Sequence, residues 1–117
     1  IATHPDINCP TETGFMPDTG AMMALVAAST GKHPDLVIGK PHAPIVEAVT
    51  EKLGLPISAL CMVGDRLYTD IALGKTGITT VLVLSGETHP DDVPHSPFRP
   101  DFVMQNLAEL VETLKSA

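Results

Sequence analysis

Short apolar runs alternate along the chain with stretches in which apolar residues recur at helical spacing. The apolar runs predict strands at Leu36–Ile38, Leu60–Val63, Thr80–Leu84 and Phe102–Met104. Helices are expected over Thr19–Thr30, Pro44–Leu53, Asp70–Lys75 and Leu107–Leu114. Because apolar strands that alternate with helices are typical of a parallel sheet covered on both faces, the pattern predicts an α/β fold.

Capping and turn residues mark where these elements begin and end. Asp18 is suited to the N-cap of the first helix, and Gly31 and Gly54 are suited to stop the first and second helices. Residues 1–3 are expected to close a strand, and the prolines and Gly14 of residues 5–14 predict a loop. The Pro- and Asp-rich residues 87–100 are expected to form a solvated excursion between two sheet elements.

Composition limits the classes of function. The 117 residues fit one small domain or a piece of a larger protein, and 44% hydrophobic with 18% charged residues is typical of a globular chain. The net charge of −7 disfavours binding to nucleic acid or to an anionic membrane, and no apolar run is long enough to span a bilayer. Because there are only two cysteines, with Cys61 in a run expected to be buried, a reduced cytoplasmic setting is favoured. Since the first residue is Ile1, we expect a fragment or a processed chain.

Two carboxylates follow the predicted strand Leu60–Val63. Gly64 allows a sharp exit from the strand, Asp65 comes directly after it, and Asp70 begins the next helix. Ligand sites of parallel sheets lie at the carboxyl ends of the strands, and paired carboxylates suit Mg²⁺. The alternative interpretation is an ordinary polar turn in which Asp70 caps a helix.

Lys40 is a second candidate, because it follows the predicted strand Leu36–Ile38 directly after Gly39. Pro41 and Pro44 stiffen the chain beyond it. A lysine in this position can neutralise a phosphate as a compact point charge. The alternative is a solvated lysine in a loop.

Taken in order, these residues resemble the C-terminal half of a haloacid dehalogenase (HAD) superfamily phosphatase. The resemblance rests on Gly39-Lys40-Pro41, on Gly64-Asp65-Arg66-Leu67-Tyr68-Thr69-Asp70 after a strand, and on Val81-Leu82-Val83-Leu84-Ser85-Gly86. It is closest to the NagD-like, 4-nitrophenylphosphatase-like branch, whose members carry a large α/β cap. Ala2-Thr3-His4-Pro5-Asp6 and Pro17-Asp18-Thr19-Gly20 resemble the closing part of that cap.

The resemblance implies the C-terminal half of a HAD-like Rossmannoid three-layer sandwich with a parallel sheet, preceded by the end of a C2-type α/β cap. Residues 1–38 would then be the C-terminal part of the cap, and residues 39–117 the C-terminal part of the phosphatase core. Gly39–Pro41 would form the crossing between them.

The resemblance also implies roles for individual residues. Lys40 corresponds to the lysine that stabilises the nucleophile and the phosphoryl group during transfer. Asp65 corresponds to a direct Mg²⁺ ligand, and Asp70 to a second acidic residue that supports the metal through water or a hydrogen bond. His4 and Asp6 correspond to substrate-binding positions, although the family usually has Asn where His4 stands. The turn at residues 85–86 lies near the site.

The family's nucleophile is an Asp-x-Asp pair on its first strand, and no Asp-x-Asp occurs in this chain. The second-motif Ser or Thr, also expected upstream, is likewise unassigned. We therefore expect the chain alone to be inactive and to self-associate, with the nucleophile in a missing N-terminal half.

The leading hypothesis is Mg²⁺-dependent hydrolysis of the phosphate ester of a small metabolite through an aspartyl-phosphate intermediate. No nucleic-acid or membrane partner is expected, and a homo-oligomer is compatible with this interpretation. The alternative is a non-catalytic acidic α/β module that binds a metal or a partner protein. Receiver domains also use aspartyl phosphate, but their lysine follows the phosphorylated aspartate, whereas Lys40 precedes Asp65.

Overall fold

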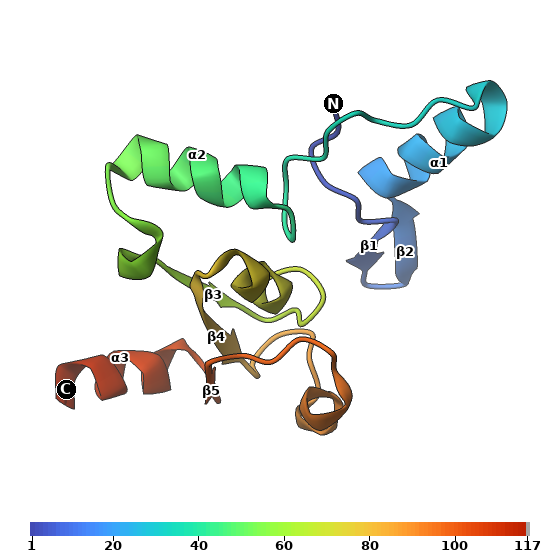
Figure 1. Ribbon diagram of the computed structural model, residues 1–117. Helices are drawn as coiled ribbons and strands as arrows, with labels where there is room; N and C mark the ends of the chain where they lie inside the picture. Colours follow the sequence, from blue (N-terminus) through green and yellow to red (C-terminus); the bar gives the residue numbers. More distant parts are fainter. Residues whose placement is uncertain (117) are drawn as a thin grey trace.

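The computed structural model describes residues 1–116, which form a mixed α/β structure (Figure 1). The helices of this part are α1 (Thr19–Thr30), α2 (Ala43–Leu53) and α3 (Leu107–Ser116). The strands are β1 (Asn8–Thr11), β2 (Gly14–Pro17), β3 (Cys61–Gly64), β4 (Thr79–Val83) and β5 (Phe102–Met104). Short 3₁₀ helices lie at Ile57–Ala59, Ile71–Thr76 and Pro90–His95.

A three-stranded parallel sheet in the order β3-β4-β5 is the centre of the fold. The register aligns Val63 with Val81 and Val81 with Phe102, so the strands end at one edge. This arrangement confirms the predicted α/β class with a parallel sheet. Among the described residues, the only strand paired with β3 is β4, which leaves the other edge of β3 without a partner.

The core is built around β4, the central strand. Leu82 is fully buried and packs with Leu67 and Ile71 of the connection between β3 and β4. A second cluster joins Val46 of α2 to Leu73 and Ile78. Both clusters lie against the segment that follows β3, and this packing fixes the path of that segment across the end of the sheet.

The predicted caps of the first two helices are present. The side chain of Asp18 accepts a hydrogen bond from the backbone N–H of Thr19 at 2.7 Å, which satisfies one free donor at the start of α1. Gly31 and Gly54 close α1 and α2 with φ of 71° and 64°, in the left-handed region that favours glycine.

The N-terminal region differs from the sequence expectation. The expected loop forms an antiparallel hairpin of β1 and β2, in which Thr11 pairs with Gly14. Every residue of both strands is exposed, so the hairpin has no apolar alternation that would reveal it in the sequence. Pro10 and Pro17 are tolerated because both strands of a two-stranded sheet are edge strands.

The strand expected at residues 36–38 is reduced to a single bridge between Ala2 and Val37. The segments cross there and exchange backbone hydrogen bonds from Ala2 N to Leu36 O and from Ile38 N to Ala2 O, at 2.8 and 3.0 Å. Figure 1 shows α1 beside the hairpin and apart from the three-stranded sheet. The division of the chain into residues 1–38 and 39–117 stays a prediction.

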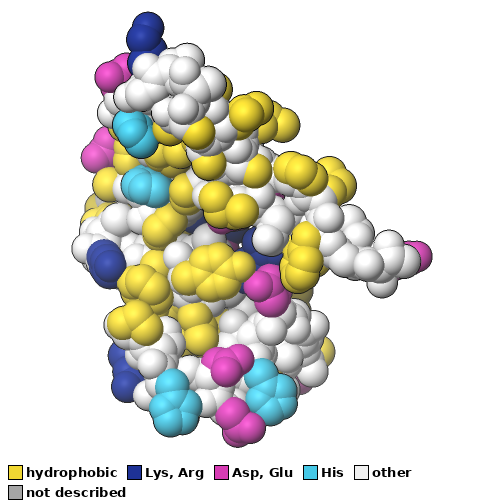
Figure 2. Space-filling view, turned by 90° about the vertical axis from the view of Figure 1, so that its right-hand side faces the viewer, with side chains coloured by type: hydrophobic (Ala, Val, Ile, Leu, Met, Phe, Trp, Pro, Cys, Tyr) yellow, Lys and Arg dark blue, Asp and Glu magenta, His cyan; other side chains and the backbone are white. Residues whose placement is uncertain are grey.

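Apolar side chains remain exposed over several elements (Figure 2). On α1, Leu25 is 70% exposed and Met22 is 62% exposed, so these apolar side chains are uncovered among the described residues. Cys61 is also exposed, contrary to the expectation of a buried position, because it opens β3 at the free edge of the sheet. Within residues 1–116 we find no helix with the length and apolar character needed to cross a membrane.

Candidate active site

A cavity of about 550 Å³ opens beyond the end of β3 and brings together the candidate residues of three chain segments. All five residues singled out from the sequence line it: His4, Asp6, Lys40, Asp65 and Asp70. The remaining lining residues are Thr3, Asp18, Gly39, Ile45, Arg66 and Thr69. Asp65 follows β3 at the edge where the parallel strands end, which is where ligand sites of such folds are found, and the residues before α2 reach this edge from outside the sheet.

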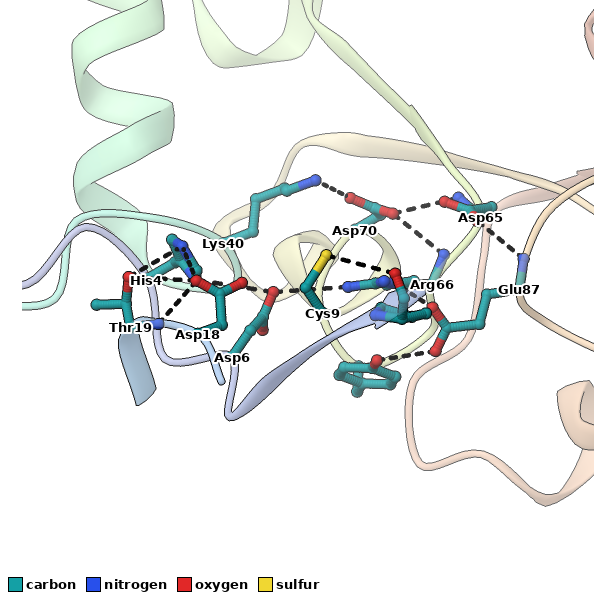
Figure 3. A network of polar contacts seen from close by, with 12 residues as sticks. His4, Asp6, Cys9, Asp18, Thr19, Lys40, Asp65, Arg66, Asp70 and Glu87 are labelled. Carbon is teal, nitrogen blue, oxygen red and sulfur yellow. Dashed lines mark hydrogen bonds and ion pairs between the residues drawn. The ribbon is translucent and has the colours of Figure 1, made fainter. Parts of the chain in front are cut away.

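Asp70 is the most buried charged group of the cavity, with 3% of its surface exposed. Its Oδ1 accepts a hydrogen bond from the ammonium group of Lys40, and the two form an ion pair. Its Oδ2 accepts hydrogen bonds from the backbone N–H groups of Asp65 and Arg66, at 3.2 and 3.1 Å (Figure 3). The carboxylate does not cap the following 3₁₀ helix, so the alternative of a capping turn does not describe it.

Gly64 is required by the position of this carboxylate. A Cβ at residue 64 would lie closer than 3.0 Å to the Cβ, Cγ and Oδ2 atoms of Asp70. Real Cβ atoms essentially never make such contacts, and Asp70 is buried and cannot swing away. The glycine at the end of β3 therefore lets the Asp70 carboxylate fold back against the strand end, where it orients the backbone of Asp65.

Asp65 presents its carboxylate at the tip of β3. Its Oδ2 accepts a hydrogen bond from the backbone N–H of Glu87 at 2.8 Å. Within residues 1–116, this hydrogen bond reaches Oδ2 of Asp65, and no hydrogen bond reaches Oδ1. One oxygen of Asp65 is therefore held by the protein, while the other is available to a ligand of the cavity.

His4 and Asp6 lie across the cavity from this group. The Nε2 atom of His4 is 3.3 Å from Oδ1 of Asp18 and 3.2 Å from the hydroxyl of Thr19. The Nδ1 atom of His4 is buried and has no hydrogen-bond partner among the described residues, its nearest acidic oxygen being Oδ2 of Asp6 at 3.8 Å. Asp18 thus has two neighbours, the helix N-terminus that it caps and the imidazole.

Arg66 is a charged residue of the cavity to which the sequence analysis assigned no role. Its Nη1 atom is 3.6 Å from Oδ2 of Asp6, and its Nε atom forms an ion pair with Glu87 (Figure 3). Glu87 also accepts a hydrogen bond from the hydroxyl of Tyr68 at 3.0 Å. Burial, and then the hydrogen bond to Glu87, raise the pKa of the Tyr68 phenol. The adjacency of Arg66 to Asp65 was the only signal in the sequence, and nothing there identified Glu87 as its partner.

The donor set suits a hard cation only in part. Among residues 1–116 there is no group of three or more His, Cys, Asp and Glu side chains placed to hold a metal. Asp65, with a free oxygen in the cavity, fits a direct Mg²⁺ ligand, since Mg²⁺ in proteins is usually held by one or two carboxylates and several waters. Asp70 fits a supporting role better, because Lys40 and two backbone amides already occupy its oxygens.

Comparison with known proteins identifies relatives along the whole chain. The chain is 36% identical to a dihydroxyacetone phosphatase of Corynebacterium glutamicum, over 96% of this chain and 41% of the relative. It is 38% identical to an acid sugar phosphatase of Staphylococcus aureus, over 98% of this chain and 44% of the relative. The chain therefore spans less than half the length of these curated relatives.

The structural comparison and the family comparison identify the same family. A crystal structure of a 4-nitrophenylphosphatase from Thermotoga maritima superposes with a TM-score of 0.88 at 53% identity, over 93% of this chain and 42% of that one. The profile of the HAD-hydrolase-like family matches residues 37–110, which include Lys40, Asp65 and Asp70. The chain belongs to the haloacid dehalogenase superfamily, in its branch of NagD-like and 4-nitrophenylphosphatase-like phosphatases.

Proposed function

We propose that the complete protein containing this chain is a Mg²⁺-dependent phosphate monoester hydrolase that acts through an aspartyl-phosphate intermediate. The observation that carries the proposal is the convergence of Lys40, Asp65 and Asp70 on one cavity. A cation beside two carboxylates at the end of a parallel sheet suits the recognition of a phosphoryl group. The phosphatase relatives support the same reaction class.

Lys40 supplies positive charge to the transferring phosphoryl group. Its side chain is 44% exposed while its partner Asp70 is 4% exposed, so Asp70 fixes the ammonium group without closing it off from the cavity. A lysine held in this way can approach a phosphate oxygen as a point charge. Charge that develops on the equatorial oxygens during transfer is stabilised by such a preorganised group.

Asp65 and Asp70 have different roles at the proposed metal site. Asp65 would hold Mg²⁺ through its free Oδ1, and Asp70 would keep both Lys40 and the backbone of residue 65 in place. When bound, Mg²⁺ supplies Lewis-acid polarisation of a phosphoryl oxygen. In this proposal Asp70 supports the site through its hydrogen bonds with Lys40 and with the backbone.

The reaction proceeds by two displacements at phosphorus. A carboxylate from the part of the protein outside this chain attacks phosphorus, the bond to the ester oxygen breaks, and the leaving oxygen takes up a proton from solvent and departs as the alcohol. Water then attacks the same phosphorus, which releases inorganic phosphate and regenerates the carboxylate. Splitting the reaction in this way lets Lys40 stabilise charge in both steps.

The substrate is a small phosphorylated metabolite. Two relatives carry names of sugar and dihydroxyacetone phosphatases, which supports a small polar substrate. His4 and Asp6 line the cavity and are the substrate-binding positions of this proposal. Because Cys9 and Cys61 are both free thiols and the net charge is −7, a reduced cytoplasmic setting without nucleic-acid partners fits the molecule.

The test is the release of 4-nitrophenol from 4-nitrophenyl phosphate by the complete protein, with Mg²⁺ or with EDTA. Asp65→Ala is expected to lower turnover more than tenfold, and Asp35→Ala, which changes an exposed aspartate, is expected to leave it unchanged. The proposal fails if the wild-type protein is inactive with Mg²⁺ present. Retention of more than about a tenth of the turnover by Asp65→Ala would refute the metal assignment.

A further inference from the structure

The loop after β4 forms hydrogen bonds with both the backbone carbonyl and the side-chain carboxylate of Asp65. The backbone N–H of Glu87 donates to Oδ2 of Asp65 at 2.8 Å. The backbone N–H and the hydroxyl of Thr88 both donate to the carbonyl oxygen of Asp65, at 3.2 and 2.6 Å. Three hydrogen bonds from two consecutive residues therefore converge on one residue at the tip of β3.

Gly86 makes this contact sterically feasible. A Cβ at residue 86 would lie closer than 3.0 Å to Oδ2, Cβ and Cγ of Asp65. The backbone of Gly86 is not in the left-handed region, so its conformation alone does not demand glycine. The requirement for glycine at this position comes from the approach to Asp65.

The loop is itself anchored at two points. The Glu87 carboxylate binds Arg66 and accepts a hydrogen bond from Tyr68, two residues of the segment that follows Asp65. Thr88 is 8% exposed, so its hydroxyl is shielded from water where it binds the Asp65 carbonyl oxygen. An anchored loop restrains Asp65 more strongly than a mobile one, because less conformational entropy is lost when the ligand geometry forms.

We propose that Gly86, Glu87 and Thr88, here named the Asp65 clamp, are positioning residues that hold Oδ2 of Asp65 and direct Oδ1 into the cavity as the metal-binding oxygen. The proposal rests on the proposed function, since it gives Asp65 the role of metal ligand. Groups that orient a metal ligand without touching the metal commonly change metal affinity by about 10–100-fold when they are removed. The clamp residues are therefore expected to set Mg²⁺ affinity.

Binding of Mg²⁺ to the complete protein, measured by isothermal titration calorimetry in the absence of substrate, tests the clamp without relying on turnover. Gly86→Ala is expected to weaken Mg²⁺ binding at least about tenfold. Gly74→Ala is the matched control, because its Cβ would meet no atom nearer than 3.4 Å and its backbone is also outside the left-handed region. The control is expected to stay within about twofold of the wild type.

Thr88 supplies a pair of variants that separates the hydrogen bond from the side-chain volume. Thr88→Val removes the hydroxyl at nearly constant volume and is expected to weaken Mg²⁺ binding about tenfold, whereas Thr88→Ser keeps the hydroxyl and is expected to bind as the wild type does. This pair also decides the question if Gly86→Ala does not fold. Equal Mg²⁺ affinity of Thr88→Val and Thr88→Ser overturns the clamp.

Asp65→Asn distinguishes the failure of the clamp from that of the proposed function. If Asp65→Asn binds Mg²⁺ as tightly as the wild type, Asp65 is not the metal ligand, and both the metal assignment and the clamp are overturned. If Asp65→Asn loses Mg²⁺ while Gly86→Ala and Thr88→Val keep it, the metal assignment stands and only the clamp is overturned.

Discussion

Removing the Asp70 carboxylate is predicted to lower the free energy of unfolding by an amount that can be worked out from its partners. Two backbone N–H groups donate to Oδ2, and each hydrogen bond to a charged acceptor contributes about 1.5 kcal/mol at the low end of its range. The ion pair with Lys40 adds at most about 1 kcal/mol, because the lysine side chain is 44% exposed. Asp70→Ala should therefore cost about 3–4 kcal/mol.

Asp70→Asn is the informative companion variant. Its amide oxygen can still accept from the two backbone N–H groups, so only the charge and the pair with Lys40 are lost. The expected cost is about 1–2 kcal/mol. Asp35→Ala removes an exposed aspartate and is expected to change the stability by less than about 0.5 kcal/mol.

Urea-induced unfolding of the complete protein in EDTA, followed by far-ultraviolet circular dichroism, measures these differences without any contribution from bound metal. The predicted order of stability is wild type, then Asp70→Asn, then Asp70→Ala. If Asp70→Ala lies within about 1 kcal/mol of the wild type, or if both variants lose the same stability, the buried carboxylate does not hold the strand end as described.

Three further predictions concern Lys40, Asp101 and the isolated chain. Lys40→Arg is expected to retain little of the phosphatase activity of the complete protein, because a planar guanidinium needs more room than an ammonium group. Near-normal turnover of this variant would show that Lys40 is only a surface charge. Hydrogen bonds from the backbone N–H and the hydroxyl of Thr80 lower the pKa of Asp101, so its ionised form stabilises the fold above about pH 4 and this contribution disappears as the pH falls through the lowered folded-state pKa. Asp101→Asn should therefore show a shallower loss of unfolding free energy on acidification than the wild type, and equal slopes in acid denaturation would contradict this. The isolated chain should release no phosphate from 4-nitrophenyl phosphate and should self-associate through the edge of β3 that has no partner strand within residues 1–116. A monomer in sedimentation that turns over substrate with Mg²⁺ would refute both expectations.

The sequence predicted the elements whose signals are local. Asp18, Gly31 and Gly54 mark the ends of helices by residue type. The apolar runs mark β3, β4 and β5, of which β4 is central and mostly buried. The hairpin of β1 and β2 was missed because exposed residues carry no periodic burial that a pattern could report. The prediction of a strand at residues 36–38 was wrong for another reason, because Val37 pairs only with Ala2 and the pairing does not continue.

The candidate site was predicted through motif order rather than through geometry. Lys40, Asp65 and Asp70 were identified from their places after predicted strands, and they line one cavity. The ion pair of Arg66 with Glu87 joins residues 21 positions apart across two strand ends, and nothing in the local sequence indicates which side chains meet. The resemblance implied roles for the two aspartates, whereas the hydrogen bonds that hold their carboxylates are revealed only by the three-dimensional arrangement.

The cavity is proposed to hold a phosphoryl group together with Mg²⁺. Binding of orthovanadate, whose five-coordinate form resembles the transition state of phosphoryl transfer, to the complete protein tests this proposal most directly by calorimetry. Vanadate is expected to bind in the presence of Mg²⁺, and omission of Mg²⁺ or the Asp65→Ala substitution is expected to weaken this binding at least about tenfold. Vanadate binding that stays as strong as that of the wild type in Mg²⁺, both without Mg²⁺ and in the Asp65→Ala variant, would contradict this proposal.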